Sequence, residues 1–167
     1  MENKELIAKI AAQKEAGGAE QAEREELVKF LIIQIEDTRY AFYAEQIKEI
    51  VMDYPLYYVP FVPKYIRGFI NRHGEPYTVF DLRMLLDGEL LEATTFLISN
   101  VGGDQIAFLV SDVVEILKVP NTQVRLLTST EDRDTFFLGA VSARDTELFI
   151  LNLENVVGRL AYDLEAS

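Results

Sequence analysis

Short runs of apolar residues alternate with turn residues along most of the chain after residue 29. Residues 30–43 combine two β-branched and aromatic runs around the polar turn 36–38, a pattern that predicts a β-hairpin. Residues 96–109 show the same pattern around the turn 102–104, where two glycines stand together. The chain is therefore predicted to be mainly β, with the same hairpin occurring twice.

The two hairpins match each other residue by residue at an offset of 66 positions. Three positions, Ile35, Tyr40 and Ile47, are apolar in both copies. Seven further pairs are identical: Phe30/Phe96, Leu31/Leu97, Ile32/Ile98, Ala41/Ala107, Phe42/Phe108, Glu49/Glu115 and Ile50/Ile116. This agreement indicates an internal duplication.

The second half of each copy matches more weakly, at an offset of 71, and aligns Gly68 with Gly139. Each copy then continues through a turn and a strand to Asp81 or Asn152, both good N-caps for a helix. The first helix is predicted to stop at Gly88. The second has an apolar stripe at i, i+3, i+4 and i+7, made by Leu153, Val156, Val157 and Leu160.

Each copy, approximately 30–88 and 94–160, thus contains four to five short strands. A sheet of that size has edges that invite aggregation, and closing it into a barrel removes them. Because 50–70 residues make a marginal core, we expect two five-stranded barrels that pack together and intertwine within 30–160, with short helices and a C-terminal helix.

The ends of the chain lie outside this pattern. Residues 1–29 form a polar tail in which Leu6, Ile7 and Ile10 could make the apolar stripe of a short helix, although a plain mobile tail is also expected from such a composition. Residues 161–167 form a C-terminal tail.

Charge and composition exclude several classes of function. The formal net charge is −12, so neither a nucleic acid backbone nor an anionic membrane surface is an expected partner. The absence of cysteine excludes disulfides and thiolate chemistry. No signal peptide and no apolar run of about 18–20 residues is visible, so we expect a cytoplasmic protein without membrane insertion.

Catalytic motifs are also missing from the sequence. His73 is the only histidine, which excludes histidine-pair metal sites, and no phosphate-binding glycine loop or nucleophile elbow occurs. The many carboxylates fall mostly in turns and tails, where a solvated surface explains them better than a catalytic pair. An enzyme is therefore not expected.

Residues 66–75, followed by 76–83, resemble the central signature of CheW-like domains. That signature runs apolar-x-G-apolar-apolar-N-L-R-G and continues into a short strand ending in apolar-apolar-D-L-R. The first hairpin, the segment 46–50 and the proline-rich passage up to Pro63 support the resemblance, which covers residues 30–160.

One position departs from the family pattern. His73 stands where the family has arginine, and Arg72 stands where it has leucine. Arginine presents a permanently charged planar fork, whereas histidine is shorter and only partly charged near neutrality. The role of the family arginine passes to Arg72, passes to His73, or is lost, and strict strand alternation would point these two side chains to opposite faces.

The resemblance implies two SH3-like barrels that act as an adaptor in chemotaxis, without cofactor or turnover. It implies binding to the regulatory domain of a CheA-type histidine kinase and to the cytoplasmic tip of a chemoreceptor. Other CheW-like domains in array rings are further expected partners, and the expected location is cytoplasmic, at membrane-associated chemoreceptor arrays.

The partner-binding residues that the resemblance implies are Ile47, Glu49, Ile50, Gly68, Asn71, Arg72, His73, Thr95 and Phe96. Structural explanations compete for four of them. Ile47 and Ile50 could be core residues, Glu49 could share a structural role with its repeat Glu115, and Gly68 could meet a backbone requirement. Introducing a charged side chain in place of Ile47, as in Ile47→Asp, would test whether the face that carries this residue binds the kinase.

The aromatic segment 54–63, which is interspersed with prolines, could either plug a barrel end or be displayed for contact. Two alternative functions stay open from sequence. One is a CheW-like adaptor for a kinase outside motility. The other, of a different class, is a small ligand-binding barrel or enzyme with a cleft at the junction of the copies.

Overall fold

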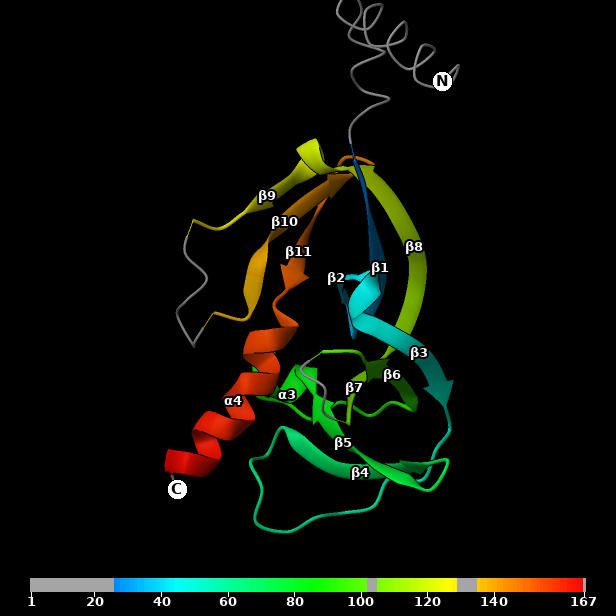
Figure 1. Ribbon diagram of the computed structural model, residues 1–167, viewed down its shortest axis with the longest axis vertical. Helices are drawn as coiled ribbons and strands as arrows, with labels where there is room; N and C mark the ends of the chain where they lie inside the picture. Colours follow the sequence, from blue (N-terminus) through cyan, green and yellow to red (C-terminus); the bar gives the residue numbers. More distant parts are fainter. Residues whose placement is uncertain (1–25, 102–104, 129–134, 167) are drawn as a thin grey trace, which may run out of the picture.

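Two β-sheets stacked end to end make up the body of the protein (Figure 1). The computed structural model describes residues 26–101, 105–128 and 135–166. The prediction of a mainly β protein with short helices and a C-terminal helix is confirmed. One sheet has five strands as expected, and the other has six.

The five-stranded sheet has the order β3-β6-β7-β5-β4. Its strands are β3 (Ile47–Met52), β4 (Ile66–Arg72), β5 (Glu75–Asp81), β6 (Thr95–Ser99) and β7 (Ile106–Val110). The six-stranded sheet has the order β8-β1-β2-β11-β10-β9. Its strands are β1 (Leu27–Ile35), β2 (Thr38–Tyr43), β8 (Asp112–Pro120), β9 (Val124–Leu126), β10 (Phe137–Ala143) and β11 (Thr146–Leu151).

The two copies of the duplication exchange their first hairpins. Hairpin β1–β2 of the first copy lies in the six-stranded sheet with the later strands of the second copy, and hairpin β6–β7 of the second copy lies in the five-stranded sheet. Parallel pairing joins the pieces, β2 with β11 and β5 with β7, whereas every other pairing is antiparallel. Each sheet is therefore built from both copies.

Aromatic side chains fill the junction that this exchange creates. Phe42 on β2 and Phe108 on β7 are repeat partners, both fully buried, and their ring centroids lie 6.1 Å apart. The ring centroid of Phe108 also lies 5.9 Å from that of Phe80 on β5. The larger core cluster accordingly contains side chains from both sheets, including Ile33 and Ile98.

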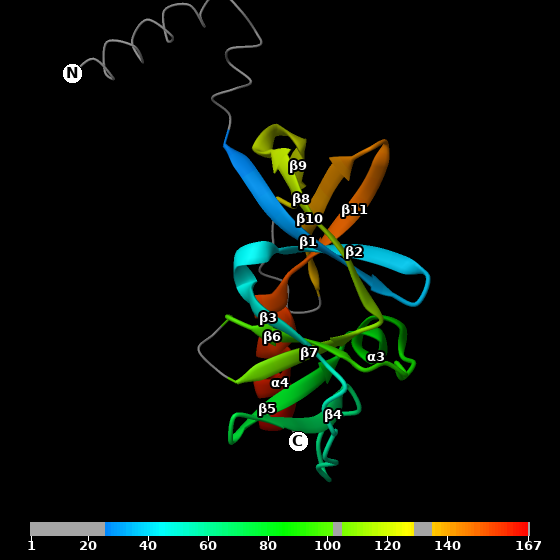
Figure 2. The same cartoon turned by 90° about the vertical axis from the view of Figure 1, so that its right-hand side faces the viewer.

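Two helices end the two copies, as predicted. Helix α3 (Leu82–Asp87) stops at Gly88, which has φ 79°, and α4 (Leu153–Ala166) starts after Asn152, whose Oδ1 accepts the Asn155 N–H at 3.1 Å. Leu153 and Val156 of the expected stripe are fully buried in the larger core. Helix α4 thus leaves β11 of one sheet and runs alongside the other (Figure 2).

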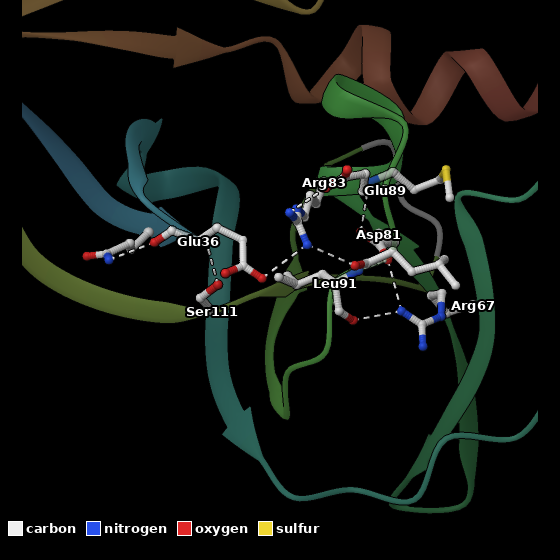
Figure 3. Close-up of polar contacts among 10 residues, drawn as sticks. Glu36, Arg67, Asp81, Arg83, Glu89, Leu91 and Ser111 are labelled. Carbon is white, nitrogen blue, oxygen red and sulfur yellow. Dashed lines mark hydrogen bonds and ion pairs between the residues drawn. The ribbon is translucent and has the colours of Figure 1, made fainter.

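Asp81 is a fully buried carboxylate that fixes the end of β5 (Figure 3). Its Oδ1 accepts the Met84 N–H at 3.0 Å, which caps α3. Its Oδ2 accepts the Leu91 N–H at 2.8 Å and Nη1 of Arg67 at 2.9 Å, while the same Nη1 donates to the Leu91 carbonyl. One carboxylate therefore holds a strand, a helix and the segment that follows the helix.

Gly68 allows the segment before β4 to pair with it. Its φ is 130°, and a Cβ at this position would lie 2.0 Å from the Tyr57 carbonyl oxygen. Tyr57 and Phe69 form a β-bridge at that point, with hydrogen bonds of 2.8 and 2.9 Å. Gly139 meets the backbone of Arg125 in the same way. The interpretation of Gly68 as a backbone requirement is confirmed.

Substitution Gly68→Ala should lower the free energy of unfolding by about 2–5 kcal/mol, because backbone strain adds to a steric overlap. Gly74→Ala is the matched control, since Gly74 has φ 80° but nothing within 4 Å of an added Cβ. We expect it to cost only about 1–2 kcal/mol. Urea denaturation of both variants measures the difference, and equal losses would contradict the close approach.

Substitution Asp81→Ala should cost about 3–5 kcal/mol, because it leaves the partly buried Arg67 guanidinium and a buried N–H without their acceptor. Asn152→Ala, at the equivalent cap of the second copy, removes a neutral cap and should cost about 1 kcal/mol. Thermal and urea unfolding test the pair. A loss at Asp81 no larger than that at Asn152 would show that the ion pair contributes nothing.

Candidate partner-binding surface

Glu49 and Arg72 form an ion pair that joins β3 and β4, the two edge strands of the five-stranded sheet. Arg72 donates to both carboxylate oxygens of Glu49, through Nε at 3.1 Å and through Nη2. Its Nη1 also donates to the Tyr54 hydroxyl at 3.2 Å. The two edges that backbone pairing leaves apart are thus connected by side chains.

His73 lies against the same guanidinium, with Nε2 2.8 Å from Nη1 of Arg72. Strand alternation ends at this point because His73 has φ 54° and belongs to the turn between β4 and β5. The expectation that residues 72 and 73 point to opposite faces is therefore wrong. A guanidinium carries only donors, so Nε2 is the acceptor in this contact.

The Glu49 carboxylate is paired by Arg72 and not by His73. Of the two residues that could take over the role of the family arginine, Arg72 is the one that contacts a carboxylate here. His73 remains exposed beside it and contributes its ring to the same surface.

The six-stranded sheet carries an equivalent ion pair, between Arg144 and Glu115, which the sequence motifs did not predict. Arg144 donates to both oxygens of Glu115, at 2.7 and 2.9 Å. Glu115 is the repeat partner of Glu49, and Arg144 aligns with His73 at the offset of 71 and shares its positive φ, 51°. The glutamate that repeats at positions 49 and 115 was the feature of the sequence that could have revealed this second ion pair. The repeat indicates that Glu49 has a structural role in addition to its place on an edge strand.

Two apolar side chains follow Lys48 on the outer face of β3, which is the face opposite to that of Glu49. Ile50 is 45% exposed and Met52, two residues further along the same face, is also exposed. Ile47, at the start of the strand, is only partly exposed and packs against the larger core. The core interpretation thus applies to Ile47 but not to Ile50.

The remaining predicted site residues are divided between surface and core. Asn71 is exposed on β4, opposite Pro76. Thr95 and Phe96 are only 5% and 2% exposed, because every residue of β6 is buried. Thr95 and Phe96 pair with the end of β3, and Gly68 is also buried. A partner cannot reach the side chains of Thr95 and Phe96 in this arrangement.

The aromatic segment before β4 is partly packed and partly displayed. Tyr57 stacks on Phe69 with ring centroids 5.2 Å apart. Phe61 is 99% exposed and Tyr58 is also largely exposed, so these two rings do not plug the barrel end. The segment is thus anchored on β4 through Tyr57 and presents Tyr58 and Phe61 to solvent.

A second polar cluster fixes the junction of the two sheets (Figure 3). Arg83 on α3 donates to Glu36, in the β1–β2 turn of the six-stranded sheet, at 3.2 Å, and to Glu89 at 2.6 Å. The Glu36 N–H donates to Oγ of Ser111, between β7 and β8, at 2.8 Å. These contacts tie the hairpin tip to the neighbouring sheet and define how the two outer faces are set relative to each other.

The part of the chain that the structure describes contains neither a cluster of metal ligands nor a membrane-spanning helix. Within residues 26–101, 105–128 and 135–166, no three His, Cys, Asp or Glu side chains gather in a way that could hold a metal ion. In the same ranges no helix has both the length and the apolar character needed to cross a bilayer.

The sequence and the fold both have known relatives. Residues 29–161 match the family model described as the CheW-like domain. The chain is 29% identical over 150 residues to the chemotaxis protein CheW of Helicobacter pylori (strain ATCC 700392 / 26695), covering 87% of this chain and 91% of that protein. The crystal structure of the scaffolding protein TtCheW from Thermoanaerobacter tengcongensis superposes with a TM-score of 0.68 at 20% identity, covering 76% of this chain and 90% of that one. The duplicated hairpins, the D-L-R cap and the family match agree, and the chain belongs to the CheW-like domain family.

Proposed function

We propose that this protein couples chemoreceptors to a CheA-type histidine kinase in chemotaxis. The observation that carries the proposal is the family match over residues 29–161, which spans both sheets and the junction between them. Proteins of this family are scaffolds in chemotaxis and not enzymes, so the chain is a scaffold whose function lies in its surfaces.

The outer face of β3 is the surface that we assign to the kinase regulatory domain. Interfaces combine exposed apolar side chains, which supply binding energy, with polar groups that fix register. Ile50 and Met52 are exposed apolar residues on this face, and the Glu49–Arg72 pair supports it by joining β3 to β4 from the opposite face of the strand. Asn71 and His73 complete the proposed contact surface.

The receptor tip is assigned to the junction of the two sheets. The junction is held by Arg83, Glu36 and Ser111, so a helical partner lying across it would meet a preformed surface rather than two independent ones. The protein would then act in the cytoplasm at membrane-associated receptor arrays, where further CheW-like domains are additional proposed partners.

Charge insertion at the exposed face tests the kinase assignment. Ile50→Asp should weaken binding to the kinase regulatory domain at least about tenfold, or about 1.4 kcal/mol, because a carboxylate replaces apolar contact area. The matched control is Ile116→Asp, at the repeat position on β8, which is also exposed. Calorimetric titration with the regulatory domain and with a receptor tip fragment measures both variants.

Both variants should melt within a few degrees of the wild type, since neither residue is buried. Ile50 is a sharper test than Ile47, because Ile47 packs on the core. Unchanged kinase affinity in folded Ile50→Asp would rule out this face. If the wild type binds neither partner and a small molecule raises its melting temperature, the ligand-binding alternative gains support.

Substitution at the turn separates binding from stability. His73→Ala should change partner affinity while altering the free energy of unfolding by no more than about 0.5 kcal/mol, because the ring is exposed. Arg72→Gln should lower stability by about 1–3 kcal/mol, because its guanidinium bonds Glu49 and Tyr54. A large stability loss in His73→Ala with unaltered affinity would make His73 a structural residue.

A further inference from the structure

Two hollows flank the short 3₁₀ turn η1 (Ala44–Gln46), where β2 ends and β3 begins. The first, of about 570 Å³, is lined by the start of β1 and by residues 43–45. The second, of about 670 Å³, is lined by residues 45–46, by residues 100–101, and by the first turns of α4. Glu45 lines both, so the two hollows are neighbours on either side of η1, and we call them together the η1 groove.

The η1 groove offers acidic and apolar groups to an occupant. Its second half is lined by the carboxylates of Glu45 and Glu154 and by Val101 and Val157, and no Lys or Arg lines it. Oε1 of Gln46 is buried without a hydrogen-bond partner among the residues that the structure describes. The first half adds the exposed side chain of Leu27 and is lined by two carboxylates, Glu26 and Glu45, and one amino group, that of Lys29. A segment with apolar residues and amino groups would complement this lining.

The first residues of this chain have that chemistry. Residues 1–14 contain three lysines and two glutamates, a net charge of +1 (3 − 2) in a chain whose total is −12. On a helix, Ile7, Ile10 and Lys14 would share one face, at i, i+3 and i+7. Residues 15–25 reverse the balance, with four glutamates and one arginine. Only the first half of the tail therefore suits an acidic groove.

The point of attachment brings this segment to the groove. The described chain starts at Glu26, which itself lines the first hollow. Fifteen residues, 11–25, separate Ile10 from Glu26 and can span about 50 Å when extended. A short tether of this kind also gives an effective concentration in the millimolar range.

We propose that residues 1–14 dock into the η1 groove of their own chain, with Leu6, Ile7 and Ile10 on its apolar part and the lysines toward Glu45 and Glu154. The groove lies at the junction of the two sheets, so the docked tail would shield part of the junction. This proposal concerns the free chain and needs no partner, so its outcome is independent of the proposed function.

The absence of cysteine from the chain allows a direct test. Ala8→Cys is combined with Gly158→Cys, which lines the second hollow and has open space for a Cβ, or with Asn121→Cys as a control. Asn121 is exposed and lies beside the attachment point, since its N–H donates to the Glu26 carbonyl at 3.0 Å, but it does not line the groove. An undocked tail would reach Asn121 at least as readily.

We expect the Gly158 pair to form an intramolecular disulfide under mild oxidation at least about tenfold faster than the Asn121 pair. Replacing the three tail lysines with glutamate should bring the rate of the Gly158 pair down to the control rate, with an unchanged melting temperature. Equal rates for the two pairs would overturn the proposal. Disulfide-linked dimers in place of monomers would also overturn it, because the tail would then be binding a second copy.

Discussion

The contact between Phe42 and Phe108 is the interaction on which the architecture depends. These two rings occupy equivalent positions in the duplicated hairpins, and the exchange of hairpins brings them into an edge-to-face contact between the two sheets, with an interplanar angle of 65°. Neither copy closes a sheet alone, because each needs the other's hairpin to complete its parallel pair. A stretch of 50–70 residues buries too little surface to be stable by itself, and the exchange merges two marginal cores into one.

The exchange also ties the two copies of the duplication together. Strands of both copies run through both sheets, so the copies cannot separate without breaking backbone pairing. The sheets themselves are held to each other by the larger core cluster, which contains side chains from both. The buried Asp81 and the Arg83–Glu36 contact then fix α3 and the hairpin tip on either side of the junction. A scaffold benefits from this arrangement, since binding faces that are held in place lose less entropy when partners dock.

The turn after β4 shows how the two copies make equivalent ion pairs with different residues. The left-handed conformation of His73 ends strand alternation and lets Arg72 reach Glu49 on the neighbouring edge. In the second copy Arg144, which aligns with His73, makes the equivalent contact with Glu115. The pairing of the glutamate is thus present in both copies, while the first copy places a histidine on the surface beside it.

The sequence by itself determined the strands, the caps and the duplication, because these depend on residues near one another in the chain. The alternation of apolar and polar residues predicted the hairpins, and the N-cap residues Asp81 and Asn152 predicted where the helices begin. The repeat of Glu49 at Glu115 indicated a role that the two residues share. Tertiary structure alone decided which hairpin completes which sheet, since a period of two identifies the faces of a strand but not its neighbours. It also decided that Phe96 is buried while Ile50 is exposed, because burial depends on what packs against a face after the chain has folded.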